Sequence, residues 1–253
     1  MRINTALFEM FEARARETEI AHVCLGLGYS VIITSDGGAG IAYTWLDSKD
    51  ACMVQKGFEN PEGRPAIDVL EYILSETPVE RTMALALINA LNYHSARTLA
   101  EQSDNTDLLD LLGVGKGTRV AMVGAFKPLI RMIKQRQGIV EVLDMGRQIG
   151  DEGRFYENLA EWPDVLMITS TSLLNNTTEA ILENAKKGIP VVMLGPSTPL
   201  VGAPFRPLGV SCLAGTVPID IDGTCRAVRH GTGTPVIQKF GRKVLLRVNS
   251  SFA

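Results

Sequence analysis

Hydroxyl and amide side chains gather where one apolar segment of the sequence ends. Residues 165–168 are apolar, and the polar residues that follow within one short turn are Thr169, Ser170, Thr171, Ser172, Asn175, Asn176 and Thr177. The apolar run predicts a strand buried on both faces, and residues 177–187 predict a helix. Ligands bind at the carboxyl edge of open parallel sheets, and helix N-termini attract anions. This segment therefore predicts a site for a small anionic or polar molecule.

A structural role competes with ligand binding at the start of this helix. Asn176 is followed three positions later by Glu179, which is the spacing of a capping box. Capping is therefore the favoured interpretation of Asn176 taken alone. Capping does not account for the polar residues before Asn176, because a strand-to-helix connection needs only about 2–6 residues.

A second polar turn follows residues 190–194, which are another strand candidate. Its residues are Gly195, Pro196, Ser197 and Thr198. In a parallel sheet both turns emerge at the same edge, so we expect Thr171, Asn175 and Ser197 to line one pocket. We also expect alanine at Thr171 or Ser197 to leave folding nearly intact, as is usual for exposed residues. A proline-ordered loop without a ligand is the alternative for this turn.

The turn after the apolar residues 119–123 contains Gly124 and Phe126. A dinucleotide fingerprint needs three glycines at such a turn, and this one has a single glycine, so we expect no standard NAD site. Asp144 lies 20 residues after the glycine, where Rossmann proteins hold a ribose, which leaves a nucleoside-type ligand open. A solvated carboxylate is the favoured alternative for Asp144.

Two polar residues belong to a predicted helix that starts at Pro78. Thr77 and Glu80 form a capping-box pattern with proline at the first helical position. Residues 83–91 are apolar except for Asn89, which places this helix in a core or between domains. Glu80 and Asn89 either cap the helix and bind backbone, which we favour, or face a cleft.

The order of predicted elements changes near residue 104. The earlier elements are helices at 4–17, 66–74 and 78–94 and strands at 20–25, 30–35 and 41–45, with a hairpin turn at 36–38. The later ones are strands at 119–123, 139–143, 165–169, 190–194 and 210–213, helices at 128–137, 152–162 and 177–187, and an edge strand at 243–248. The fold class is therefore α/β overall, with an α+β domain at 1–104 and a Rossmann-like parallel α/β domain at 105–253. The boundary is expected between Leu99 and Thr118, with residues 103–106 as its centre.

The composition argues against several classes of function. Hydrophobic residues make up 45% of the chain, charged residues 21%, and the net charge is -3, which gives no basis for binding nucleic acid or an anionic membrane surface. We see no signal peptide and no membrane-length apolar run, so we expect a cytoplasmic protein. The four cysteines and His22 lack the paired spacing of a zinc site, so we expect reduced thiols and no stoichiometric zinc or nickel.

These motifs together resemble the putative heavy-metal-chelation family. The resemblance covers nearly the whole chain and rests on Glu80, residues 89–91, 123–124, Pro128, 169–177, 195–200 and 213–216. It implies an enolase N-terminal-like domain, a Rossmann-like domain and a site in the cleft between them. Glu80 and Asn89 would line this cleft from the first domain, and the turn residues from the second. The sequence departs from the family pattern at Asn176, where members often have glycine.

The function favoured by the residues and by the resemblance is that of a small-molecule binding protein or enzyme. Its ligand would be an anionic chelator or a chelator precursor. The alternatives are a direct metal carrier and a transferase with a nucleoside-type cofactor. The resemblance raises a heavy metal or metal chelate as the cofactor, and the sequence leaves open whether the chain forms a homo-oligomer.

Overall fold

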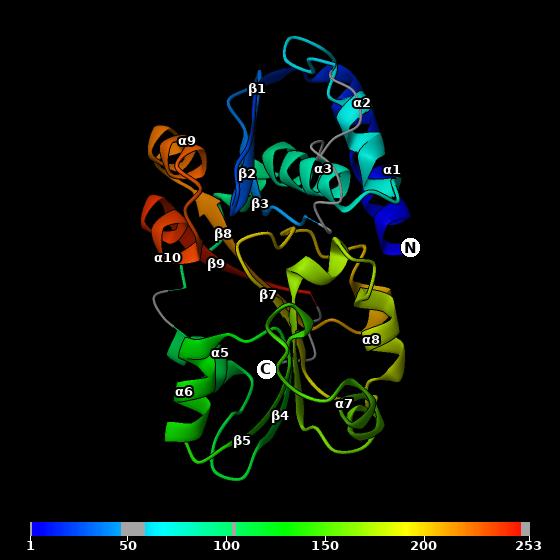
Figure 1. The fold of residues 1–253 in the computed structure, drawn as a ribbon, viewed down its shortest axis with the longest axis vertical. Helices are drawn as coiled ribbons and strands as arrows, with labels where there is room; N and C mark the ends of the chain where they lie inside the picture. The colour runs from blue at the N-terminus through cyan, green and yellow to red at the C-terminus, as the bar shows by residue number, and fades with distance from the viewer. Residues whose placement is uncertain (1, 47–58, 103–104, 249–253) are drawn as a thin grey trace.

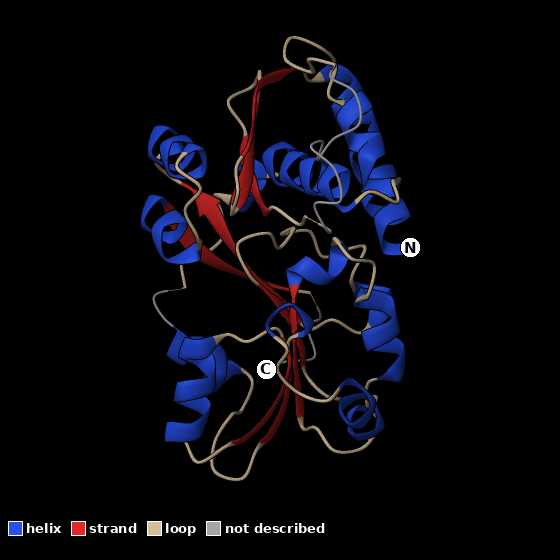
Figure 2. Cartoon of the chain, in the orientation of Figure 1, coloured by secondary structure: helices blue, strands red, loops and turns tan. Residues whose placement is uncertain are grey.

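The computed structural model describes residues 2–46, 59–102 and 105–248 of the chain. Their strands form a three-stranded antiparallel sheet and a six-stranded, mostly parallel sheet. Figures 1 and 2 show the two sheets one above the other in an elongated molecule, with helices beside both. The predicted fold class, a small α+β part followed by a parallel α/β part, is confirmed.

The first part of the chain surrounds the three-stranded sheet. Its elements are α1 (Arg2–Glu17), β1 (Ile20–Leu25), β2 (Tyr29–Thr34), β3 (Ala39–Tyr43), α2 (Ile67–Leu70), η1 (Glu71–Leu74), α3 (Pro78–Leu91) and α4 (Tyr93–Ala96). The expected hairpin turn joins β2 to β3, where Gly37 has φ +80° and Thr34 N donates to Gly38 O at 2.9 Å. The predicted helix over 78–94 is divided between α3 and α4.

Helix α3 packs directly on strands β2 and β3, and its apolar residues are buried as predicted. Gly40 of β3 makes this close approach possible, because a Cβ at that position would lie 2.1 Å from Ala86 O. Burial of a helix that is apolar on every side removes a large hydrophobic surface from water. The helix therefore fixes the position of Asn89, its half-buried polar residue.

The second part of the chain builds the six-stranded sheet. Its elements are α5 (Asn105–Leu111), β4 (Arg119–Val123), α6 (Lys127–Gln135), β5 (Ile139–Leu143), η2 (Met145–Arg147), α7 (Glu152–Leu159), β6 (Val165–Thr169), η3 (Ser170–Leu173), α8 (Thr178–Asn184), β7 (Val191–Leu194), η4 (Arg206–Leu208), β8 (Cys212–Pro218), α9 (Ile221–Arg229), α10 (Thr234–Ile237), η5 (Gln238–Phe240) and β9 (Gly241–Arg247). Strand β8 lies later than the predicted 210–213, and α8 ends before the predicted residue 187. Strand β9 is the predicted edge strand, and it runs antiparallel to β8.

The strand order of the large sheet is β5-β4-β6-β7-β8-β9. The chain moves outward from β4 to β5 and then crosses back over β4 to β6, so the direction of winding reverses between β4 and β6. This is the strand order of flavodoxin-like doubly wound sheets. Ligands of such sheets bind outside the carboxyl ends of the strands at the point of reversal. The turns after β4 and β6 are therefore the turns that a ligand would meet.

Helices α9 and α10, which the sequence analysis did not predict, cover the small sheet. Val228 and Ile237 belong to one apolar cluster with Val31 and Ile41 of the first part, and Figure 1 shows α9 beside β2. The two parts of the chain thus share a core. The predicted domain boundary stays a prediction, and residues 103–104 at its centre lie outside the described residues.

None of the helices in the described part of the chain has the length and apolar character needed to span a bilayer.

Candidate functional site

The turn after β4 approaches the turn after β6 very closely. Gly124 has φ +91°, a conformation that favours glycine, and its N–H donates to Leu143 O at 2.7 Å. A Cβ at Gly124 would lie 2.9 Å from Cβ of Thr169 and 3.3 Å from the ring of Phe126. The single glycine of this turn is therefore required by contact between the two turns, and it brings Gly124, Phe126 and Thr169 together.

Asp144 fixes the turn after β4. Its carboxylate accepts hydrogen bonds from Ala125 N at 2.8 Å, from Arg147 N at 3.0 Å and from Arg147 Nη1 at 2.8 Å. Both carboxylate oxygens are thus bound by the chain itself, and the side chain is 13% exposed. The favoured alternative, a solvated carboxylate, is wrong, because Asp144 positions the turn. Contact with a nucleoside stays a prediction.

The turn after β6 is a 3-10 segment whose hydroxyls bind one another. Thr169 Oγ1 and Thr171 Oγ1 are 2.9 Å apart, and Ser172 Oγ lies 2.7 Å from Thr178 Oγ1. Further along, Thr177 Oγ1 donates to Asn175 Oδ1 at 2.7 Å. Thr169 and Thr171 are half-buried, so these two hydroxyls remain within reach of a small molecule.

Ser170 differs from its neighbours because its hydroxyl has no hydrogen-bond partner among the described residues. The side chain is 1% exposed. Its Oγ faces the turn after β7, where a Cβ at Gly195 would lie 2.9 Å away. Gly195 has φ +131°. The turns after β6 and β7 therefore approach each other through a glycine, just as the turns after β4 and β6 approach each other through Gly124.

The predicted capping box at Asn176 and Glu179 is wrong. Thr177 is the N-cap of α8, and Asn176 has φ +59°, in the left-handed region that suits asparagine or glycine. Glu179 Oε1 instead accepts from Ile3 N at 2.8 Å, and Asn176 Oδ1 accepts from Asn4 Nδ2 at 3.2 Å. The two side chains hold the N-terminus of α1, whose own first turn has no acidic residue.

The turn after β7 is a contact between the two parts of the chain. Ser197 Oγ accepts from Tyr43 N at 2.7 Å, and Ser197 O accepts from Asn89 Nδ2 at 3.1 Å. Asn89 also donates to Ile41 O at 2.9 Å, which agrees with its favoured backbone-binding role. Thr198 Oγ1 donates to Gly195 O at 2.8 Å. Ser197 is 1% exposed, so the exposure from which we expected a mild effect of alanine is absent at this position.

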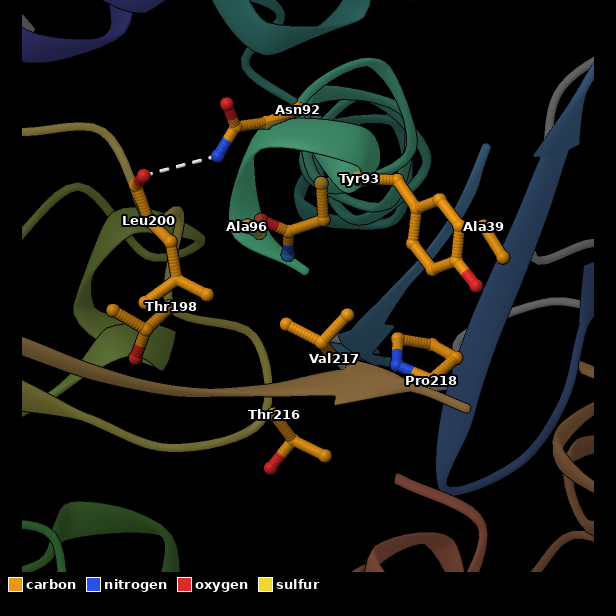
Figure 3. Close-up of a pocket in the computed structure, with 10 residues that line it drawn as sticks. Ala39, Asn92, Tyr93, Ala96, Thr198, Leu200, Thr216, Val217 and Pro218 are labelled. Atoms are coloured by element: carbon orange, nitrogen blue, oxygen red, sulfur yellow. Dashed lines mark hydrogen bonds between the residues drawn. The ribbon is translucent and has the colours of Figure 1, made fainter. Parts of the chain in front are cut away.

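A small cavity lies beside this contact. It has a volume of about 10 Å³, the space of a single water, and its lining includes Asn89, Thr198 and Pro218. Figure 3 shows Tyr93 and Ala96 on one side of it and Val217 on the other, with Asn92 Nδ2 donating to Leu200 O at 3.0 Å. Thr171, Asn175 and Glu80 do not line this cavity. The structure thus joins Ser197 to Asn89, whereas a common pocket with Thr171 and Asn175 stays a prediction.

Glu80 binds within its own part of the chain. It accepts a hydrogen bond from Ser75 Oγ, whereas Thr77, the N-cap of α3, makes no side-chain cap bond. The predicted capping box is therefore absent, although Pro78 does occupy the first turn. Ser75 Oγ also accepts from Thr77 N at 3.0 Å, so Ser75 links Glu80 to the residue that begins the helix.

Three basic residues near these turns were missed by the sequence analysis. Arg81 is 3% exposed, and its Nε donates to Leu174 O at 2.6 Å, which ties α3 to the turn after β6. Lys127 and Arg147 are exposed beside the turn after β4. A charged residue inside an otherwise apolar helix was the available signal for Arg81. Lys127 and Arg147 have no such signal, because surface lysines and arginines are common.

Two family profiles match the chain, and both are described as putative heavy-metal chelation. One covers residues 8–92 and the other residues 107–247. The chain belongs to this family. An uncharacterised protein of Methanocaldococcus jannaschii is 22% identical over 97% of the chain and 96% of its own length.

Two solved structures of family members share the fold. A protein of unknown function from Pyrococcus horikoshii has a TM-score of 0.79 and 22% identity, with 98% of each chain covered. A second, from Desulfitobacterium hafniense, has a TM-score of 0.75 and 21% identity, and the match covers 96% of this chain and 98% of that one. These two family members therefore share the overall fold of this chain.

The family description raises the question of a metal site. Within residues 2–46, 59–102 and 105–248, no three His, Cys, Asp or Glu side chains lie together in a group that could hold a metal ion. Burial raises the pKa of the thiols of Cys24, Cys212 and Cys225, which disfavours the thiolate that binds metals. Cys52 lies outside the described residues. The described side chains therefore do not fit a metal held by protein ligands alone.

Proposed function

We propose that this member of the putative heavy-metal-chelation family binds a small organic anion, a metal chelator or its precursor, where the turns after β4 and β6 meet. The observation that carries the proposal is the contact of Gly124 with Thr169 at the reversal point of the sheet. Sheets of this type bind ligands there for a topological reason, because the connections that follow the two strands lead to opposite faces of the sheet.

The charge around these two turns favours an anion. Lys127 begins α6 with no acidic residue in the first turn, and the positive end of the helix dipole adds to its charge. The side chain of Arg147 is 59% exposed, and its guanidinium forms an ion pair with Asp144. Lys127 has no ion-pair partner among the described residues. An anion at this point would neutralise Lys127 and lie at the positive end of the α6 dipole.

Neutral donors at the same turns suit an oxygen of a carboxylate. The hydroxyls of Thr169 and Thr171 bind each other, which leaves one of their two O–H groups free to donate to a ligand. A chelating anion supplies the metal ligands itself, so the proposal does not depend on a cluster of His, Cys, Asp or Glu in the protein. This agrees with the described residues, which offer no such cluster.

The test is a calorimetric titration of the full chain with citrate, Ni²⁺ and an equimolar mixture of the two. We expect citrate to bind with or without the metal and Ni²⁺ alone not to bind stoichiometrically. Citrate at about 100 times its Kd should also stabilise the fold by about 2.7 kcal/mol. Stoichiometric binding of Ni²⁺ alone would favour the direct metal carrier instead.

Paired variants locate the site. Lys127→Gln and Thr171→Val should each weaken citrate binding about tenfold, which corresponds to the loss of one charge-assisted or buried hydrogen bond. Lys134→Gln is the matched control, because Lys134 is an exposed lysine in the last turn of the same helix. Citrate binding that is unchanged in Lys127→Gln and Thr171→Val places the ligand elsewhere and contradicts the proposal.

A further inference from the structure

A larger pocket lies at the carboxyl end of β8, next to the start of β9. It has a volume of about 480 Å³, within the usual range of small-molecule sites, and none of its lining residues belongs to the turns after β4, β6 or β7. The lining residues are Arg97, Glu101, Ile219, Asp220, Lys239, Phe240, Gly241 and Arg242. The pocket forms where the segment after α4 meets the start of β9, so both parts of the chain contribute to it.

Three cationic side chains surround this pocket, and no described carboxylate forms an ion pair with any of them. Arg97 lies over the ring of Tyr93, with its Cζ 5.4 Å from the ring centroid. Arg242 Nη2 donates to the carbonyl oxygens of Arg97 and Leu99, which holds the guanidinium at the wall of the pocket. Lys239 is exposed. The cations are therefore held near one another by the fold.

One donor of the Arg242 guanidinium lacks an acceptor. The Nε–H of Arg242 is shielded from solvent and has no hydrogen-bond partner among the described residues. The chain therefore leaves part of the hydrogen-bonding capacity of the Arg242 guanidinium unused.

The acidic residues of the pocket compensate only part of this charge. Asp220 caps α9, because its Oδ1 accepts from Gly223 N at 2.8 Å. Glu101 is exposed. With three cations and two carboxylates among the lining residues, the pocket carries a net charge of +1, which one carboxylate group neutralises.

An apolar wall completes the pocket. Ile219 is 49% exposed although it is a large aliphatic residue, and Phe240 is half-buried beside it. The backbone fixes these residues, because Ile219 N donates to Phe240 O at 2.8 Å. An aromatic or branched apolar group that packs here would remove the exposed surface of Ile219 from water.

We propose that this pocket binds a monocarboxylate that carries an aromatic or branched apolar group. Arg97 and Lys239 contact the carboxylate, its second oxygen accepts from the guanidinium of Arg242, and the apolar group packs on Ile219 and Phe240. A planar guanidinium fork matches the geometry of a carboxylate, which gives this anion an advantage over a neutral amide of the same shape. The site is separate from the turns after β4 and β6, where we place the ligand of the proposed function.

The experiment compares benzoate with benzamide, its neutral isostere, by calorimetric titration of the full chain. Benzoate should bind at least tenfold more tightly than benzamide, and added salt should weaken its binding. Equal affinity for the two compounds, or no saturable binding of benzoate at millimolar concentrations, overturns the proposal.

Variants then tie binding to the pocket. Arg97→Gln and Lys239→Gln should each weaken benzoate binding about tenfold while thermal unfolding stays unchanged, since both side chains are exposed. Lys116→Gln removes the same charge from an exposed lysine outside the pocket and should bind benzoate like the unmodified chain. Arg97→Gln should leave citrate binding intact, which keeps this result distinct from the proposed function. Equal effects of Lys239→Gln and Lys116→Gln overturn the assignment.

Discussion

Two buried serines at the same edge of the large sheet should respond in opposite ways to alanine. Ser170 and Ser197 are each 1% exposed, and both belong to turns that follow parallel strands. Ser197 Oγ accepts a hydrogen bond from Tyr43 N at 2.7 Å, whereas Ser170 Oγ has no partner among the described residues. The substitutions Ser197→Ala and Ser170→Ala remove the same atom from environments of similar burial, so they isolate the effect of the partner.

The magnitude follows from what each substitution leaves behind. Ser197→Ala leaves Tyr43 N–H without its acceptor at the contact between the two parts of the chain, and an unsatisfied donor of this kind costs about 1–3 kcal/mol. For a chain of this length that corresponds to a fall in Tm of roughly 2–4 °C per kcal/mol. Ser170→Ala removes a hydroxyl that is already unsatisfied, so its effect should be near zero or slightly stabilising.

Urea denaturation followed by circular dichroism measures both changes. We expect a lower midpoint for Ser197→Ala with an unchanged slope, since the surface exposed on unfolding stays the same. Ser197→Thr, which keeps the hydroxyl, tests whether the acceptor or the packing is responsible. Equal loss of stability in Ser170→Ala and Ser197→Ala would refute the reasoning, because it would show that the hydrogen bond across the two parts contributes nothing.

Two further predictions concern backbone strain and pH. Gly124→Ala should destabilise the fold by about 3 kcal/mol or more, since its Cβ would lie 2.9 Å from Thr169. Gly113→Ala is the control, because Gly113 has φ +64° but lies in open space, and its substitution should cost only about 1–2 kcal/mol. Similar losses of stability for both variants would show that the contact between Gly124 and Thr169 is not tight. Burial raises the pKa of Tyr29 to about 12, so its contribution to stability is complete below the ordinary pKa of 10.0 and is lost as pH rises towards 12. The free energy of unfolding should therefore fall by about 2–3 kcal/mol between pH 10 and pH 12 in the unmodified chain but not in Tyr29→Phe. Identical pH profiles of unfolding for the two proteins would contradict this prediction.

Most elements of the fold follow from local patterns in the sequence. Strands β4, β5 and β6 lie where alternation of apolar runs and helical segments predicts them. The signal is clearest for β6, because a strand buried on both faces must be apolar throughout. Helix α9 was not predicted, although Cys225 and Val228 recur at helical spacing with Arg226 and Arg229 between and after them. Only the small sheet from the first part of the chain gives that helix an apolar face to cover.

The sequence by itself determined that polar turns would follow the parallel strands and that they would share one edge of the sheet. The need for glycine at Gly124 follows from the tertiary structure, because a Cβ there would lie 2.9 Å from Thr169. The tertiary structure decided what each polar side chain does. Ser197 finds its partner 154 residues away and Glu179 finds its partner 176 residues away. The physical reason is that a hydroxyl or carboxylate in a turn has the same local signature whether its partner is a distant backbone amide or a ligand, and only the packing of the two parts selects between them.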